Sequence, residues 1–373
     1  VNYLIKGWEK VSGEINTHEE HDEDTTGILH ITKPLRERKS MNKDVDIIPK
    51  PLLEKQAALF TDDVCRLLLY KEKLPRAVFI DYLRILCGLH LALYTMKIVY
   101  LLPKMVDAGT RDVTDDWAMV VDLTDNLDSI VSQYACKDIE RMENSYGKYI
   151  RATYMVDVIQ KRKRCDVDEA FRILKEDNNK QGEYYEKELN DIEDSLPNSD
   201  EKEFDKNDFH EMLEFFPEKD YFDMFVHVLE KSNLGASQYK YIHDFVDAVC
   251  MKNSPSMLLA DSRSKRHPRR GALGSKLLET LVQLLVLKEK SNGGYETRSL
   301  SIDELASAIR ERYGLIINGI GEGRFADADV EMNAAFRVNM DAFKNKLRQI
   351  GFYTDMSDAC ILQKIRPRYK LED

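Results

Sequence analysis

The feature that most constrains this chain is the apolar stretch 79–102. Its apolar residues recur at intervals of three and four, a spacing that predicts one long helix. Because this helix is apolar on most of its faces, we expect it at the centre of a core. The nearly uncharged run 85–99 contains His90 and Lys97 and is too short to span a bilayer. We expect Pro103 to kink or end the helix.

The composition is typical of a soluble globular protein with a charged surface. The chain has 373 residues, 43% of them hydrophobic and 32% charged, which allows two or three domains and excludes a collagen-like, mucin-like or wholly disordered chain. No N-terminal stretch has the order of a signal peptide. The six cysteines lie far apart without a CxxC pair, which is typical of reduced thiols. We therefore expect a cytoplasmic protein without a membrane partner.

The sequence predicts three parts. Residues 1–51 lack a sustained period, contain the acidic stretch 18–27, and are expected to form an extended, partly mobile segment with a short strand at 28–32. Residues 52–260 have helical spacing and form an irregular helical domain without a repeat. Residues 261–373 form a basic arm followed by a mixed α+β domain. The predicted fold class is therefore mainly α.

The sequence of the helical domain also predicts two helix caps and one short apolar element. Asp62 is a candidate helix N-cap, and Thr124 begins a polar turn that would cap a helix at 127–134. Residues 116–123 are short and apolar, and they fit either a buried strand or the start of that helix.

The charge is divided unevenly along the chain. Residues 261–373 contain 20 lysines and arginines against 16 aspartates and glutamates, a net charge of +4. Since the whole chain carries −11, the first 260 residues carry −15. Such asymmetry indicates that one part meets a polyanion. The arm holds five of the basic residues: Arg263, Lys265, Arg266, Arg269 and Arg270.

The order of elements after the arm resembles a winged helix. A helix at 273–288 is followed by a strand at 296–300 and by a second helix that begins with the capping box Ser301-x-x-Glu304 and ends at Gly314. A glycine-rich loop leads to a third helix at about 331–349, and a hairpin at 352–365 follows. The long loop leaves the start of the third helix open.

The winged-helix resemblance implies a surface for DNA. Such domains commonly place the third helix in the major groove and the wing along the backbone. Carried to this chain, the contacts come from the third helix (Arg337, Asn339, Lys344, Lys346, Arg348) and from the wing (Lys364, Arg366, Arg368). The basic arm would reach phosphates or a minor groove. The alternatives are that the arm is a solvated linker and that the winged helix binds protein.

No motif in the sequence establishes a catalytic centre. The run 18–24, HEEHDED, has metal-ligand residue types but lacks the H-E-x-x-H spacing, which favours a solvated loop. Gly319-x-Gly321-x-Gly323 lacks the rest of a P-loop or a dinucleotide motif, so we interpret it as a turn. His90 is expected to be buried and hydrogen-bonded, and Asp122 to be a cap or turn acid. We predict no catalytic residue, no metal and no cofactor.

Three stretches together resemble accessory subunits of multi-gene bacterial anti-phage defence operons of the methylation-associated or restriction type. They are 89–109, 119–135 continued by 145–159, and 254–287. The resemblance implies a non-catalytic cytoplasmic subunit that works with an ATPase, a methyltransferase or a nuclease of the same operon. It transfers no functional residue.

The leading hypothesis is a DNA-binding adaptor subunit that holds duplex DNA through the winged helix. One alternative is a scaffold that binds only protein. A second is a cryptic metal-dependent nuclease with acids from the helical domain.

Overall fold

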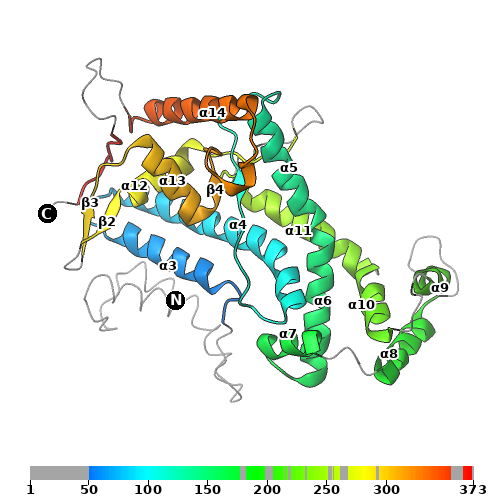
Figure 1. Ribbon diagram of the computed structural model, residues 1–373. Helices are drawn as coiled ribbons and strands as arrows, with labels where there is room; N and C mark the ends of the chain where they lie inside the picture. The colour runs from blue at the N-terminus through cyan, green and yellow to red at the C-terminus, as the bar shows by residue number, and fades with distance from the viewer. Residues whose placement is uncertain are drawn as a thin grey trace, which may run out of the picture.

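The computed structural model describes residues 50–176, 182–197, 205–214, 216, 220–231, 233–250, 254, 256–260, 268–290, 294–353 and 364–371. Over these ranges the chain is mainly helical with a few short strands, which confirms the predicted mainly α class (Figure 1). The strand predicted at 28–32 and the acidic run 18–24 lie outside the described residues.

The long helix predicted from the apolar period is α4, Arg76–Ala108, which lies beside α3, Glu54–Leu68. The prediction that Pro103 ends or kinks the helix is wrong in one respect, since α4 continues past it to Gly109, where the backbone turns left-handed with φ 73°. Leu101, Leu102 and Met105 around the proline are buried, so packing holds the helical path there. Asp62 lies inside α3 and is not its N-cap.

Among the residues that the structure describes, seven more helices follow before residue 260: α5 Ile130–Asn144, α6 Tyr146–Lys163, α7 Val167–Glu176, α8 Gly182–Ser195, α9 Lys206–Glu214, α10 Tyr221–Lys231 and α11 Asn233–Cys250. Helices α7 to α10 lie at the end of the molecule away from α14, Val330–Gln349. Helix α5 is capped by Ser129, whose side chain accepts from the backbone N–H of Ser132, and not by the turn at Thr124.

The short apolar stretch at 116–123 contains a buried strand, so the helical alternative is wrong. Strand β1, Met119–Val120, pairs in parallel with β4, Leu315–Ile316, which joins segments almost 200 residues apart. A second two-stranded sheet is the antiparallel hairpin of β2, Leu287–Glu289, and β3, Tyr295–Thr297. Both sheets are short, and helices provide most of the surface that covers the core.

The predicted helices of the last third are present. They are α12, Ser275–Leu285, α13, Ile302–Tyr313, and α14, with a 3-10 turn η1 at Gly323–Phe325 before α14. The capping box of Ser301 and Glu304 is formed in both directions, and Gly314 ends α13 in a left-handed conformation with φ 76°. These local predictions are confirmed.

After α14 the chain returns across the start of α13. The backbone N–H of Ile365 donates to the carbonyl of Leu300 at 2.7 Å, and the N–H of Arg366 donates to the carbonyl of Phe352 at 2.9 Å. The return segment 364–366 thus lies between residue 300 and residue 352. The predicted turn at 355–358 lies outside the described residues.

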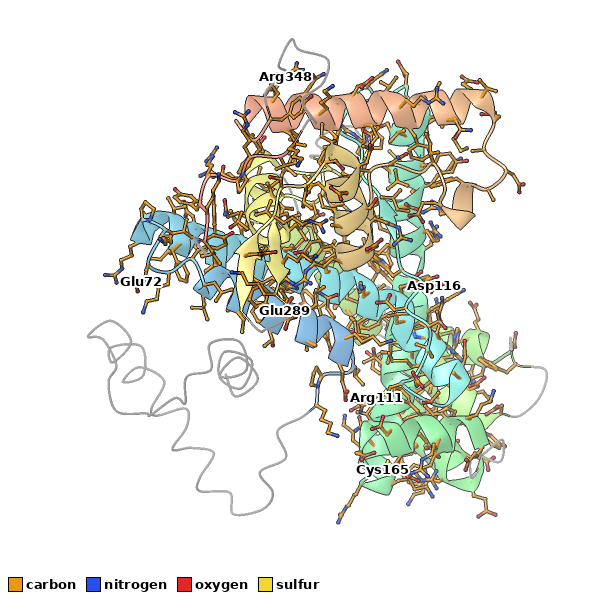
Figure 2. The ribbon with its side chains drawn as sticks, turned by 60° about the vertical axis from the view of Figure 1, so that its left-hand side comes forward. Glu72, Arg111, Asp116, Cys165, Glu289 and Arg348 are labelled. Atoms are coloured by element: carbon orange, nitrogen blue, oxygen red, sulfur yellow. The ribbon has the colours of Figure 1, made fainter. Side chains whose placement is uncertain are left out.

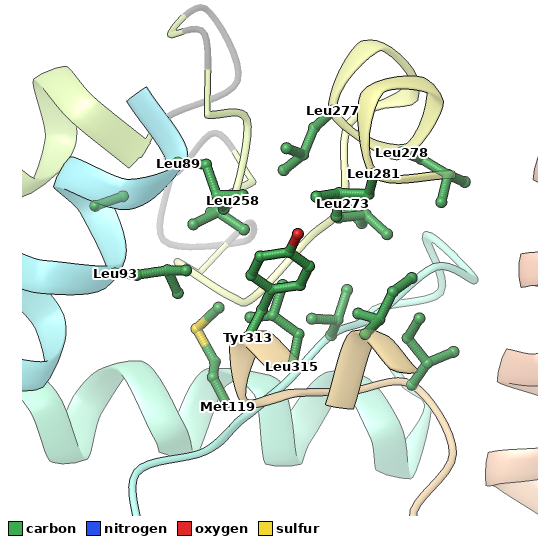
Figure 3. Packing of buried hydrophobic residues seen from close by; sticks show 14 of the residues in the cluster. Leu89, Leu93, Met119, Leu258, Leu273, Leu277, Leu278, Leu281, Tyr313 and Leu315 are labelled. Atoms are coloured by element: carbon green, nitrogen blue, oxygen red, sulfur yellow. The ribbon is translucent and has the colours of Figure 1, made fainter. Parts of the chain in front are cut away.

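One hydrophobic cluster crosses the predicted boundary at residue 260. It unites Leu89 and Leu93 of α4 with Leu277 of α12 and with Tyr313 and Leu315. Figure 3 shows Tyr313 among the leucines of both parts. Because the core is continuous, the two parts support each other, and the division into domains stays a prediction about chain organisation.

Helix α4 is long and apolar enough to cross a membrane by length and composition. However, 67% of its most apolar 18-residue stretch is buried inside the molecule. A central core helix meets the same criteria, and its burial here fits that role.

A buried carboxylate joins α3, α4 and α13. Asp63 is fully buried; one of its oxygens accepts from His90 Nε2 and from the Tyr313 hydroxyl, both at 2.9 Å. The other oxygen accepts from Arg312 Nε at 3.0 Å. His90 is also bonded to Gln56 at 3.1 Å, so the prediction of a buried, hydrogen-bonded histidine is confirmed. Burial would raise the pKa of Asp63, but the His90 hydrogen bond and the charge of Arg312 lower it.

The core assignment predicts that Leu93→Ala lowers the free energy of unfolding by about 2–5 kcal/mol, because it leaves a cavity beside α12 and α13. Leu91→Ala is the matched control on the same helix, where the side chain is 48% exposed. Urea denaturation measures both variants. Equal, small effects would show that α4 is not the central helix.

The Asp63 network predicts a pH-dependent stability. Since the folded pKa lies below the ordinary value of 3.8, the contribution of Asp63 is present above about pH 4 and is lost as the pH falls through the folded pKa. Asp63→Asn should cost about 3–5 kcal/mol at pH 7, where Arg312 loses its buried partner. Denaturation of both proteins should show the difference shrinking below pH 4. A constant difference would contradict this network.

Candidate nucleic-acid interface

The described end of the basic arm is turned into the protein. Arg270 is 6% exposed; its Nε donates to Asp122 Oδ2 at 2.9 Å and its Nη2 donates to Asp125 Oδ1 at 3.1 Å. Asp122 also accepts from Thr124 at 2.7 Å, which agrees with its predicted role as a turn acid. The prediction that Arg270 contacts DNA is wrong, because its guanidinium is buried in an ion pair with Asp122.

Arg269 is held in the same way. Its Nη1 donates to Glu143 Oε1 at 2.7 Å and contacts His243, and its Nη2 pairs with Asp247. Burial raises the pKa of Asp247, although Arg269 and His243 act in the opposite direction. The side chain of Arg269 is 16% exposed, so its predicted contact with phosphate is also wrong. Three further residues of the arm lie outside the described residues: Arg263, Lys265 and Arg266.

Asn339 is the clearest correction on the third helix. Its side chain is fully buried. Its Nδ2 donates to the carbonyls of Val121 at 2.9 Å and Ile317 at 2.8 Å, and its Oδ1 accepts from the N–H of Leu123 at 2.9 Å. The expectation that it faces solvent and reads a base is wrong, because the ends of β1 and β4 need these hydrogen bonds inside the core.

The basic residues of α14 differ in exposure: some pack against the protein and others face solvent. Lys346 is half-buried and donates to the backbone carbonyl of Leu273, so it holds the helix against the start of α12. Its contact with a base stays a prediction that this hydrogen bond does not favour. Lys344 is half-buried over the ring of Tyr353, 5.3 Å from the centroid. Arg348 is exposed on the outer side of α14, with Nη1 3.2 Å from Asn345 Oδ1 (Figure 2).

The return segment presents two basic side chains to solvent. Ile365 is 1% exposed, whereas Lys364 and Arg366 on either side of it are exposed. This alternation is what a strand on a core produces. Arg368 is committed elsewhere, since it pairs with Glu279 and donates to the carbonyl of Ile350 at 2.8 Å. Its contact with DNA stays a prediction, and the ion pair would compete with it.

The described parts of α14 and of the return segment 364–366 contain four exposed basic residues, which we call the basic edge: Arg337, Arg348, Lys364 and Arg366. Arg337 and Arg348 are eleven residues apart on α14, which places them on the same side of a helix with 3.6 residues per turn. The exposed acids Glu331 and Asp341 lie on the same helix. Most of the positive character of the edge therefore comes from its end near residues 348 and 364–366.

Two further motifs have structural roles or remain untested. A Cβ atom at Gly319 would lie 2.2 Å from the ring of Phe336, so this glycine permits close packing and fits the predicted turn. Within the described residues, no group of three or more histidine, cysteine or acidic side chains is placed to hold a metal ion, and the run 18–24 lies outside them.

The described architecture is that of a mainly helical protein tied together by buried polar contacts, with a small basic surface near its C-terminal end. The chain belongs to the family described as methylation-associated defense system protein MAD7, whose family model matches residues 1–369. This confirms the predicted relation to a subunit of a defence operon. Comparisons with curated proteins and with solved structures give no match.

The position of Asn339 predicts a loss of stability where sequence reasoning expected none. Asn339→Ala should lower the free energy of unfolding by about 1–3 kcal/mol or more, because it leaves two carbonyls and one N–H unpaired in the core. Asn345→Ala, at an exposed position of the same helix, should change it by less than about 0.5 kcal/mol. Urea denaturation compares them. Equal stability of Asn339→Ala and wild type would refute the inward orientation.

Proposed function

We propose that this protein is a non-catalytic adaptor subunit of its defence system and that it holds duplex DNA by the phosphates through the basic edge. The observation that carries the proposal is the exposure of Lys364 and Arg366 on the return segment, which is hydrogen-bonded to Phe352 just after the C-terminal end of α14. Arg269, Arg270 and Arg368 form ion pairs with acids of the protein, whereas the side chains of Lys364 and Arg366 are exposed and have no ion pair among the described residues. We further propose a cytoplasmic location.

The proposal includes a winged-helix arrangement of the last third. The order α12, the segment before Ser301, α13, α14, Phe352 and the return segment 364–366 is the order of such a domain. The hydrogen bonds Ile365 to Leu300 and Arg366 to Phe352 support it, because they give the return segment the central position that the last strand has in a winged helix. The β2–β3 hairpin and the pairing of β4 with β1 are additions to the simple pattern.

The expected mode of binding is independent of sequence. Lys and Arg side chains on a protein surface contact phosphates, which position a duplex without reading it. The side chains that we expected to read bases, Asn339 and Lys346, serve the fold instead. Recognition of a particular or modified sequence would then come from other proteins of the same system.

A scaffold that binds only protein is the second candidate, and one observation favours it. Val330 is 87% exposed and Val338 is 57% exposed, and with the exposed Ala334 they follow each other at intervals of four along α14. A row of exposed apolar side chains on one helix face suits a protein partner better than DNA. The strongly negative first part of the chain also avoids polyanions.

Salt-dependent binding tests the DNA proposal. The triple variant Arg337→Ala, Lys364→Ala and Arg366→Ala should bind short duplexes of different sequence more weakly and to a similar extent. If all three side chains contact phosphates, the slope of log affinity against log salt should fall by about 2–3. Fluorescence anisotropy of the full chain over a range of salt concentrations measures it.

The matched control removes the same charge far from the edge. Lys148→Ala, Lys163→Ala and Lys187→Ala change exposed lysines on α6 and α8 and should leave the slope unchanged. If both triple variants bind like wild type, the basic edge does not hold DNA. If Val338→Asp then abolishes copurification with a protein of the same system, the scaffold function replaces the proposal.

A further inference from the structure

A polar cleft of about 900 Å³ lies between α3, α13 and the segment 112–115, on a part of the molecule that the basic edge does not include. Four cationic side chains from three helices line it: Lys55, Arg66, Lys97 and Arg312. Its volume is within the range of pockets that hold small organic ligands.

The two arginines are fixed by acids that lie behind them. Asp62 Oδ2 accepts from Arg66 Nε at 2.8 Å and also pairs with Arg312, so one carboxylate bridges two guanidinium groups. Arg312 is further held by Asp63 at 3.0 Å, and Arg66 Nη1 donates to the carbonyl of Leu287 at 2.9 Å. The two groups are thus held in place before any ligand arrives.

Each arginine keeps donors for a ligand. The hydrogen bonds among the described residues use Nε and Nη1 of Arg66 and Nε and Nη2 of Arg312, and both side chains line the cleft. Lys97 Nζ uses one N–H on Asp115 Oδ2 at 2.7 Å, and Lys55 is exposed at the rim. Both oxygens of Asp63 already accept hydrogen bonds from protein side chains. The cleft is therefore lined by guanidinium groups that are not saturated by the protein, and such groups match the oxygens of a phosphate.

The rest of the lining suits a ligand that is more than a bare anion. Asp112 and Glu311 are exposed acceptors in the wall, which would oppose inorganic phosphate and would accept from hydroxyl or amine groups. Apolar contacts are supplied by four side chains: Leu59, Val113, Leu285 and Ala308. A nucleoside phosphate combines phosphate oxygens, ribose hydroxyls and an apolar face in one molecule.

We propose that this cleft binds a nucleoside phosphate, with Arg66, Arg312, Lys55 and Lys97 on the phosphates and Asp112 and Glu311 on the sugar or base. The site has no role in hydrolysis in this proposal. Binding would instead affect how α3 and α13 are held together, since Arg312 also belongs to the Asp63 network that joins them.

Isothermal titration calorimetry of the full chain tests the proposal with ATP, AMP, inorganic tripolyphosphate and a duplex without terminal phosphates. We expect ATP or AMP to bind more tightly than tripolyphosphate. Lys55→Glu and Arg66→Gln should each weaken nucleotide binding by about tenfold or more, since each removes a charged donor. Lys55 is exposed, so Lys55→Glu should fold normally; the melting temperature checks Arg66→Gln.

Two controls separate the possible results. Lys71→Glu makes the same charge change at an exposed position just beyond α3 and should leave nucleotide affinity unchanged. The triple variant of the basic edge should also bind nucleotide normally, so that failure of one proposal does not affect the other. The inference is overturned if no nucleotide binds at millimolar concentration, if Lys55→Glu binds like wild type, if tripolyphosphate binds as well as ATP, or if the unphosphorylated duplex displaces the nucleotide.

Discussion

The buried carboxylate of Asp63 is the contact on which the arrangement of this protein depends. A charge removed from water is tolerated only when hydrogen bonds and an opposite charge surround it. Asp63 obtains these from His90 on α4 and from Arg312 and Tyr313 on α13, so two helices from opposite ends of the sequence must meet α3 in one geometry. Leucines around Tyr313 then close the core on both sides of that point.

Other buried carboxylates repeat this principle and explain where the basic residues of the last third go. Asp122 forms an ion pair with Arg270. Asp138 forms an ion pair with Arg324 and also accepts a hydrogen bond from the N–H of Val120 in β1 at 2.8 Å. Acids of the first part and arginines of the last part thus form ion pairs inside one molecule. Part of the charge asymmetry along the sequence, which indicated a polyanion, is used in these pairs.

Because these arginines are used in internal ion pairs, they are less available to contact DNA, and this affects which function the structure supports. Several arginines of the last third are used in internal ion pairs, which supports the proposed adaptor role over direct reading of a base sequence. The basic edge would supply a modest, salt-sensitive hold on DNA, and the exposed valines of α14 would suit a neighbouring protein. The cleft between α3 and α13 is a separate place at which a small phosphate ligand would meet the Asp63 network.

The sequence by itself determined the elements whose signals are local. The three-and-four period of α4, the capping box at Ser301, the glycine that ends α13 and the C-terminal end of α14 could all be predicted, because each depends on residues within a few turns. The three stretches that resembled defence subunits also pointed to the correct family. Alternation around Ile365 was partly visible as a hairpin pattern.

Only the tertiary structure decided which way polar side chains face. Asn339 lies off the apolar stripe by spacing, yet it is buried, because its partners at Val121 and Leu123 come from more than 200 residues away. Arg270 finds Asp122 across 148 residues, and Pro103 stays within a helix that long-range packing supports. Local periodicity indicates which apolar residues are buried. A buried ion pair or a parallel strand pair depends on two segments that are distant in the sequence, and neither segment alone predicts the contact.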